Sequence, residues 1–85
     1  MKFMVEGTFK QAPTPELMGL IPAEIARGNA LQSDGLRVAI YVAADLSESW
    51  QVFDTASEAE LREALTTLPL SPYVDYRITP LEEAS

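Results

Sequence analysis

The last third of the chain places a helix start, a helix stop and a closing strand in quick succession. Residues 57–60, Ser-Glu-Ala-Glu, have the form of a capping box, in which the Ser57 hydroxyl accepts from the Glu60 amide and the Glu60 carboxylate reaches back to the Ser57 amide. Pro69 then ends the helix, because proline has no N–H to donate within one. Residues 73–79 alternate between apolar and polar side chains and are bracketed by prolines, which predicts a strand. A helix therefore leads directly into the last strand of a sheet.

Three earlier segments also alternate as half-buried strands do, namely residues 2–9, 36–44 and 50–54. In the second of these, four apolar side chains are expected on one face: Leu36, Val38, Ile40 and Val42. The stretch between the second and third segments is short and polar, which predicts an antiparallel hairpin.

A helical region is predicted between the first and second strands. Thr14 suits the N-cap position and Pro15 the first helical position. Pro22 removes one backbone donor, so we expect a kink or a second helix start there. Gly35 ends the element, because glycine readily adopts the left-handed conformation after a helix. The element order is then β, α, β, β, α, β.

This order predicts a ferredoxin-like α+β fold, with a four-stranded antiparallel sheet and two helices on one face. We expect a single domain over residues 1–85, of which residues 81–85 form a frayed tail. The other face of the sheet is then uncovered, and bulky residues are expected on it: Met4, Tyr41, Phe53 and Tyr73. Two copies packed sheet against sheet would bury this face and form a dimeric α/β barrel.

Size and composition favour the same association. A domain of 85 residues buries only about 60–65% of the surface that its unfolded chain exposes. The chain has no cysteine and no histidine, which excludes disulfides, thiolate nucleophiles, Cys/His zinc sites and imidazole bases. Because 47% of the residues are hydrophobic, a homodimer or higher homo-oligomer is the expected way to bury the surplus, and we expect no metal.

The charge and hydropathy pattern excludes two classes of partner. Thirteen acidic and six basic residues give a net charge of −7, which repels phosphate backbones, so nucleic acid is not expected as a partner. No apolar run approaches the roughly 18 residues of a membrane span, and Glu6 interrupts the N-terminal segment too early for a signal peptide. We therefore expect a cytoplasmic protein with no membrane partner.

The C-terminal part of the chain resembles the muconolactone isomerase family. The resemblance is carried by a set of residues at matching positions: Phe53-Asp54, Glu58 to Leu61, Leu68-Pro69-Leu70, Pro72-Tyr73, Asp75 and Thr79-Pro80-Leu81, with Phe3, Val5 and Glu24-Ile25 earlier in the chain. It implies a cofactor-free enzyme of aromatic-compound catabolism, dimeric or ring-like, that moves a carbon–carbon double bond within a small carboxylate-bearing lactone. Most of the matching residues shape the fold, so they support architecture more than chemistry.

Such a reaction needs a base for a carbon-bound proton and a donor for the enolate oxygen. Glu24, at a position similar to the family pattern, is the first candidate base, and Asp45 is the alternative. Tyr41 and Trp50, on the two hairpin strands, are candidate donors. Each has a structural interpretation as well: Glu24 as a surface helix residue, Asp45 as a turn former, and the two aromatic residues as core or interface side chains.

A substrate carboxylate also needs a cation. Arg27, one helical turn after Glu24, is a candidate, and Arg37 and Arg77 on strands are alternatives. These arginines can equally pair with neighbouring acidic residues, Arg27 with Glu24 and the strand arginines across the sheet. Two function classes thus stay open, a cofactor-free isomerase and a non-catalytic barrel that binds a small hydrophobic ligand or serves as an oligomeric building block.

Overall fold

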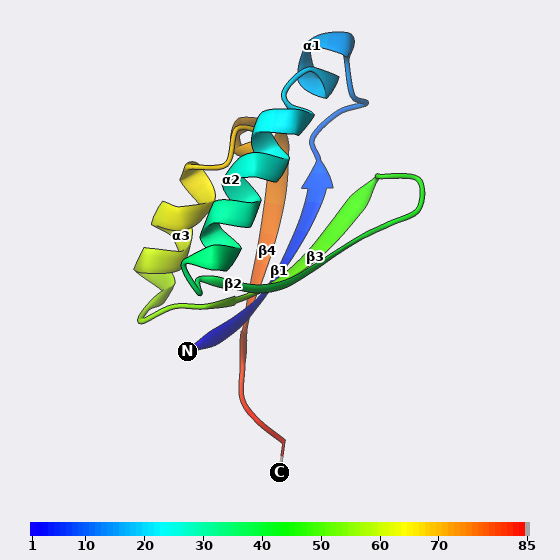
Figure 1. Ribbon diagram of the computed structural model, residues 1–85. Coiled ribbons are helices and arrows are strands. Elements are labelled where there is room, and N and C mark those ends of the chain that lie inside the picture. The colour runs from blue at the N-terminus through cyan, green and yellow to red at the C-terminus, as the bar shows by residue number, and fades with distance from the viewer. Residues whose placement is uncertain (85) are drawn as a thin grey trace.

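The computed structural model describes residues 1–84 and has the predicted ferredoxin-like architecture (Figure 1). In chain order the elements are β1 (Lys2–Phe9), α1 (Pro15–Met18), α2 (Ile21–Ser33), β2 (Arg37–Val42), β3 (Glu48–Asp54), α3 (Glu58–Thr66), the 3₁₀ turn η1 (Ser71–Tyr73) and β4 (Val74–Leu81). The four strands form one antiparallel sheet in the order β2-β3-β1-β4. Helices α2 and α3 lie side by side against one face of this sheet.

The predicted helix boundaries are confirmed by their caps. Thr14 Oγ1 accepts from the Leu17 amide at 3.2 Å, and Pro15 follows at the first position of α1. The chain then breaks and restarts with Pro22 in the first turn of α2. Gly35 has a φ of +81°, which glycine adopts without strain and which lets the chain leave α2 for β2.

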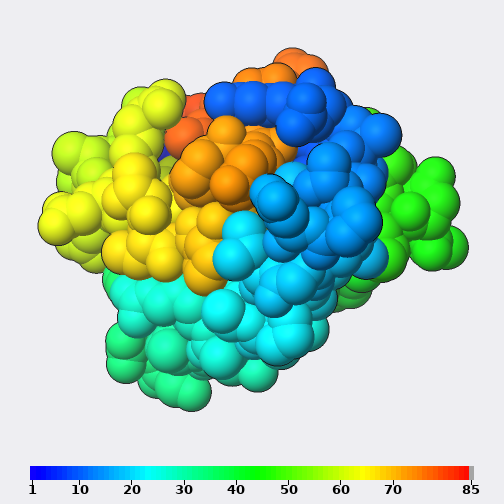
Figure 2. Space-filling view, turned by 90° about the horizontal axis from the view of Figure 1, so that it is seen from above, coloured from blue at the N-terminus to red at the C-terminus, as the bar shows by residue number. Residues whose placement is uncertain are grey.

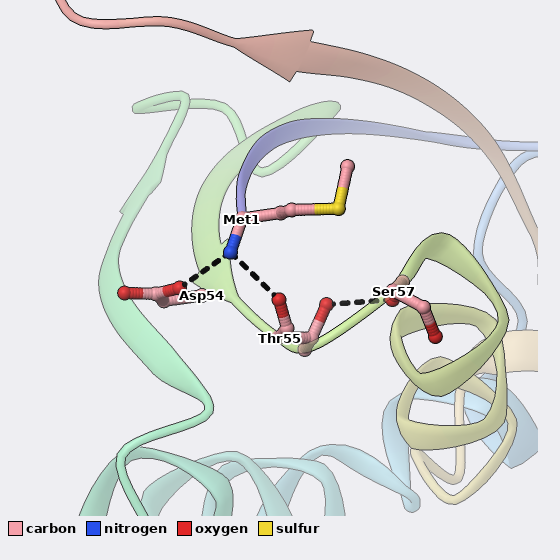
Figure 3. Close-up of polar contacts among 4 residues, drawn as sticks. All are labelled: Met1, Asp54, Thr55 and Ser57. Carbon is pink, nitrogen blue, oxygen red and sulfur yellow. Dashed lines mark hydrogen bonds and ion pairs between the residues drawn. The ribbon is translucent and has the colours of Figure 1, made fainter.

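Helix α3 begins at the predicted cap and is tied to the start of the chain. Ser57 Oγ accepts from the Glu60 amide at 3.2 Å. The amino group of Met1 donates to Asp54 Oδ1 at 3.2 Å and to the Thr55 carbonyl at 2.8 Å, and Thr55 Oγ1 donates to the Ser57 carbonyl at 2.8 Å (Figure 3). These contacts fix the beginning of β1 against the loop that joins β3 to α3.

The apolar core lies between the two longer helices and the sheet. Its fully buried members come from β1, α2, β3, α3 and the segment after α3: Phe3, Val5, Leu31, Phe53, Leu61 and Leu68. Phe53 was expected on the uncovered face and that expectation is wrong, because it pairs with Phe3 and so shares the helix side with it. Tyr73, which was also expected on a strand of that face, lies instead in η1, before β4 begins.

Strand β2 contains an irregularity that the alternating sequence does not reveal. Arg37 pairs with Phe53 and Ala39 pairs with Val52, so Val38 is an additional residue that shifts the register. The prediction that Leu36, Val38, Ile40 and Val42 share one face is therefore wrong. Past this bulge, Ile40 pairs with Gln51. The bulge thus turns Arg37 toward the helices, where its side chain is buried.

No helix formed by residues 1–84 lies on the opposite sheet face, which we call the outer face. Cross-strand pairs on it join Met4 with Val52 and Trp50 with both Glu6 and Tyr41. Met4, Val52 and Trp50 are half-buried, and Tyr41 is 70% exposed. This face is therefore an apolar strip with charged residues at both ends, Lys2 and Asp54 at one and Glu6 and Glu48 at the other.

The C-terminal end of the chain extends the sheet and then leaves it. Leu81 pairs with Lys2, and residues 82–84 follow without regular secondary structure. Of the expected tail, Ser85 lies outside the described residues. No helix within residues 1–84 has the length and apolar character needed to cross a membrane.

Candidate functional site

A group of polar side chains is built into the helix side of the sheet, at the edge of the apolar core. Arg37 on β2 and Gln51 on β3 are only 6% and 4% exposed. Glu24 on α2 and Tyr76 on β4 are half-buried beside them. Because buried polar groups are unfavourable unless they are hydrogen-bonded, the contacts of these four residues define what the cluster can do.

The guanidinium of Arg37 is held by two amide side chains. Its Nε donates to Gln32 Oε1 at 3.1 Å and its Nη1 donates to Gln51 Oε1 at 3.2 Å. Gly28 of α2 covers it, since a Cβ built at Gly28 would meet Nη1 at 2.5 Å. Burial lowers the pKa of Arg37, and the negative charge of Glu24 acts in the opposite direction. The group stays cationic at neutral pH, because a free arginine loses its proton only above pH ~12.

Glu24 lies in the first turn of α2 and faces the segment that follows α3. Its Oε1 accepts from the backbone N–H of Leu70 at 2.9 Å. In Figure 2 the yellow-to-orange segment that joins α3 to β4 lies beside the cyan part of α2. Burial raises the pKa of the Glu24 carboxyl, while the hydrogen bond from Leu70 and the charge of Arg37 act to lower it. A carboxylate with a raised pKa is a stronger base than a solvated one.

Tyr76 brings a phenol to the same side of the sheet. It pairs with Gly7 across β1 and β4 and packs against the core. Burial, and then the negative charge of Glu24, raises the pKa of Tyr76 to about 12, with a hydrogen bond to Ser71 acting in the opposite direction. The hydroxyl is therefore protonated at neutral pH and available as a hydrogen-bond donor.

Two of the predicted site residues, Glu24 and Arg37, are brought together by the structure, each close enough to influence the charge of the other. Arg27, on the next turn of α2, instead directs its Nε to Thr67 Oγ1 at 2.8 Å. Tyr41 and Trp50 pair with one another on the outer face. The sheet thus separates these two aromatic side chains from Glu24 within one protomer.

The remaining predicted residues, Asp45 and Arg77, lie away from the cluster. Asp45 is in the exposed turn between β2 and β3, where its Oδ1 accepts from the Ser47 hydroxyl at 2.6 Å and from the Ser47 amide at 3.0 Å. Both bonds lower the pKa of Asp45. Arg77 is on the outer face, with its Nε 3.7 Å from Glu6 Oε2.

The outer face also carries a surface hollow of about 300 Å³ with a mixed polar rim. It is lined by residues at one end of three strands: Glu6, Gly7, Thr8, Glu48, Ser49, Trp50, Asp75 and Arg77. Three carboxylates against one arginine make it a poor place for an anionic compound. It does not include Glu24, so the polar cluster on the helix side remains the candidate active site. Within residues 1–84 no group of three or more acidic, histidine or cysteine side chains is placed to hold a metal ion.

Sequence reasoning missed four contributors to the cluster: Gly28, Gln32, Gln51 and Tyr76. Gln51 gave a usable signal, because a polar residue on the apolar phase of a strand that also buries Phe53 needs a buried partner. The other three gave none, since Gly28 and Gln32 depend on how α2 packs against Arg37 and Tyr76 depends on the pairing of β4 with β1.

A solved structure of muconolactone isomerase is 28% identical, covers 99% of this chain and 91% of its own, and superposes with a TM-score of 0.83. A 5-chloro-2-hydroxyhydroquinone dehydrochlorinase from Burkholderia phenoliruptrix AC1100, in complex with 2,5-dihydroxybenzoquinone, is 11% identical, with coverage of 99% and 96% and a TM-score of 0.80, and shows the same fold.

One of the two sequence comparisons agrees with the first of these structures. No curated protein matches the sequence significantly. The sequence model of the family described as muconolactone delta-isomerase matches residues 1–85, which is the whole chain. The protein therefore belongs to the muconolactone delta-isomerase family.

Proposed function

We propose that this protein is a cofactor-free isomerase that shifts a carbon–carbon double bond within a small carboxylate-bearing lactone, with Glu24 as the base. Membership of the family supports the reaction class. The observation that carries the assignment of the base is the half-buried Glu24 carboxylate, which Leu70 orients and burial makes more basic. Few surface carboxylates combine a fixed orientation with such a shift, and perturbed carboxyl groups are concentrated at functional sites.

The proposed chemistry is a proton transfer between two carbons of one molecule. Glu24 removes a proton from the carbon next to the double bond, the electron pair moves into the ring, and negative charge develops on the lactone carbonyl oxygen. The double bond forms at its new position when the protonated Glu24 returns the same proton to the other end of the three-carbon unit. No electron is gained or lost, so the reaction requires no redox partner.

Tyr76 is the proposed donor to the enolate oxygen. Its phenol is protonated at neutral pH and lies on the same side of the sheet as Glu24, whose charge affects its pKa. Tyr41 and Trp50, the donors suggested by sequence, lie on the other side of the sheet. The sheet therefore keeps them out of reach of Glu24.

The protein is also proposed to work as a homo-oligomer in the cytoplasm. The outer face presents Met4, Trp50 and Val52 on the strands that two copies would bring together. A chain of 85 residues has a small core, so burial of this apolar strip would add to its stability. Sheet-to-sheet packing would join two copies through the same patch of each.

The test is a direct ultraviolet assay of the purified protein with muconolactone. Glu24→Gln keeps the acceptor for the Leu70 amide and removes the base, so kcat is expected to fall by about 10²–10⁴-fold. Glu63→Gln, on the exposed side of α3, removes the same formal charge and is expected to retain wild-type kcat.

Two results would refute parts of this proposal. A folded Glu24→Gln variant with wild-type turnover would remove Glu24 as the base. A wild-type protein that gives no rate above buffer with muconolactone or related lactone acids would favour the second function class, a non-catalytic barrel.

A further inference from the structure

We infer that Arg37 is the anion-binding residue of this site, and that the part of its guanidinium not engaged by Gln32 and Gln51 receives the carboxylate of the substrate, with Gly28 leaving room on α2 for the guanidinium itself. This inference rests on the proposed function, because it assigns the substrate's charged group to a place beside Glu24. It concerns a binding residue and its cradle, neither of which is part of the proton transfer.

Within residues 1–84 the buried charge of Arg37 has only neutral direct partners. Its two recorded hydrogen bonds go to the amide oxygens of Gln32 and Gln51. Among residues 1–84 no carboxylate forms an ion pair with it. A guanidinium has five N–H donors in a planar fork, and a buried cation is unfavourable without an anion to pair with. A carboxylate ligand would supply that anion and could accept two parallel hydrogen bonds.

Arg37 differs from the other arginines in burial and in the charge of its partners. Arg62 is paired with Glu58 at 3.1 Å on the surface of α3. Arg77 is beside Glu6 on the outer face, and Arg27 is hydrogen-bonded to Thr67. Arg37 combines burial with the absence of a recorded ion pair. In a chain of net charge −7, such a cation is where an anionic substrate would be held.

Gly28 of α2 closely approaches the guanidinium of Arg37. A Cβ at this position would lie 2.5 Å from Nη1 and 3.0 Å from both Cζ and Nη2 of Arg37. A side chain at this position would therefore require the guanidinium to shift. Glycine is unfavourable in the middle of a helix, so its presence in α2 is explained by the room it gives to Arg37.

Arg37 lies within electrostatic reach of Glu24. The charges of Glu24 and Arg37 influence one another without direct pairing. A substrate carboxylate on Arg37 would leave the neutral ring of the same molecule free to lie against Glu24 and Tyr76. Arg37 would thereby bind and orient the substrate, and its loss should raise KM more than it lowers kcat.

The test uses the saturated lactone γ-carboxymethyl-γ-butyrolactone, which has the ring and the carboxylate but no double bond to move. Its methyl ester is the neutral control. Titration into ¹⁵N-labelled wild-type protein should shift the Nε–Hε NMR signal of Arg37 for the acid and leave it in place for the ester. The signals of Arg27, Arg62 and Arg77 provide internal references. This readout needs neither turnover nor a variant.

Variants then measure the contribution of each part. Arg37→Met and Gly28→Ala should each weaken binding of the acid by at least about tenfold, because charge-assisted hydrogen bonds to the carboxylate are lost or misaligned. Arg62→Met removes an exposed arginine and should leave the dissociation constant unchanged. Circular dichroism establishes that each variant is folded.

The inference is overturned if the acid leaves the Arg37 signal unmoved, if acid and ester shift it equally, or if folded Arg37→Met binds the acid as tightly as the wild type. Failure of the proposed function looks different. In that case the acid still shifts the Arg37 signal, whereas Glu24→Gln turns over lactone normally or no lactone reacts.

Discussion

The carboxylate of Glu24 accepts a hydrogen bond from the backbone N–H of Leu70 at 2.9 Å and so joins positions that are 46 residues apart. The contact links the first turn of α2 to the segment that leads from α3 into β4. It satisfies an amide of a buried residue and fixes the orientation of a partly buried acid. One interaction therefore serves both the packing of this segment and the site.

The raised pKa of Glu24 predicts how stability changes with pH. Since burial raises this pKa above the ordinary value of 4.5, the folded state holds the proton more tightly than the unfolded state does. The stability that Glu24 contributes is present below the unfolded pKa and is lost as pH rises through the folded pKa. Glu24→Gln removes this dependence. The free energy of unfolding of Glu24→Gln minus that of the wild type should therefore be larger at about pH 7.5 than at about pH 4.5, which means that the variant is relatively more stable at the higher pH.

Urea denaturation at the two pH values, at one protein concentration, measures this difference. Glu63→Gln is the matched control, since it removes a carboxylate from the exposed side of α3. If the difference in free energy of unfolding between Glu24→Gln and the wild type does not change with pH, or falls as pH rises, burial does not dominate the ionisation of Glu24.

The contact between Gly28 and Arg37 predicts a substitution whose effect changes sign with its partner. Alanine in place of a helical glycine normally stabilises by about 1 kcal/mol. At Gly28 the added methyl shifts a guanidinium whose hydrogen bonds are worth about 1.5–3 kcal/mol each, so loss of one of them would leave Gly28→Ala destabilised by about 0.5–2 kcal/mol net. In an Arg37→Ala background the same change should become neutral or stabilising. Equal effects in both backgrounds, measured by urea denaturation, would mean that the two residues are not coupled.

Most of the fold was predictable because its signals are local. Thr14, Pro22 and Ser57 act through hydrogen bonds or missing donors within a few residues, and each helix begins where they indicate. The strands follow from alternation and the pairing of β2 with β3 from their short connection, whereas the order β2-β3-β1-β4 follows from the βαββαβ plan. The position of Leu81 in β4 shows how little the sequence says about where a terminal strand stops.

The site was less predictable because it depends on register and packing. Alternation through residues 36–42 conceals the bulge at Val38, which turns Arg37 toward the helices. The meeting of Arg37 with Gln51 then depends on how β2 pairs with β3. Gly28 reads in sequence as a weak helix position, and only the packed structure gives it a partner. Glu24 was found from the family resemblance and not from any local pattern.

The apolar strip on the outer face predicts that self-association can be disrupted by one charge. Val52 is half-buried on this face, opposite Met4 on β1. Val52→Lys would place an ammonium group between two sheets, where its desolvation is unfavourable, so the proposed oligomer should dissociate into monomers. Sedimentation velocity at matched concentration measures this. Ala59→Lys, on the exposed side of α3, should sediment as the wild type does. A wild-type protein that is already a folded monomer at micromolar concentration would contradict the proposal of an oligomer.

The assignment of Tyr76 as the donor predicts a specific change in kinetics. Tyr76→Phe keeps the ring that packs against the core and removes only the hydroxyl. Because the hydrogen bond to the developing oxyanion is stronger in the transition state than in the ground state, kcat should fall by about 10–10³-fold with little change in KM. Tyr73→Phe removes a hydroxyl from η1, outside the polar cluster, and should retain wild-type kcat. Loss of the Tyr76 hydroxyl also removes its bond to Ser71, so circular dichroism and urea denaturation must show a folded variant. If that folded variant turns over lactone at the wild-type rate, the oxyanion is stabilised by a group other than Tyr76.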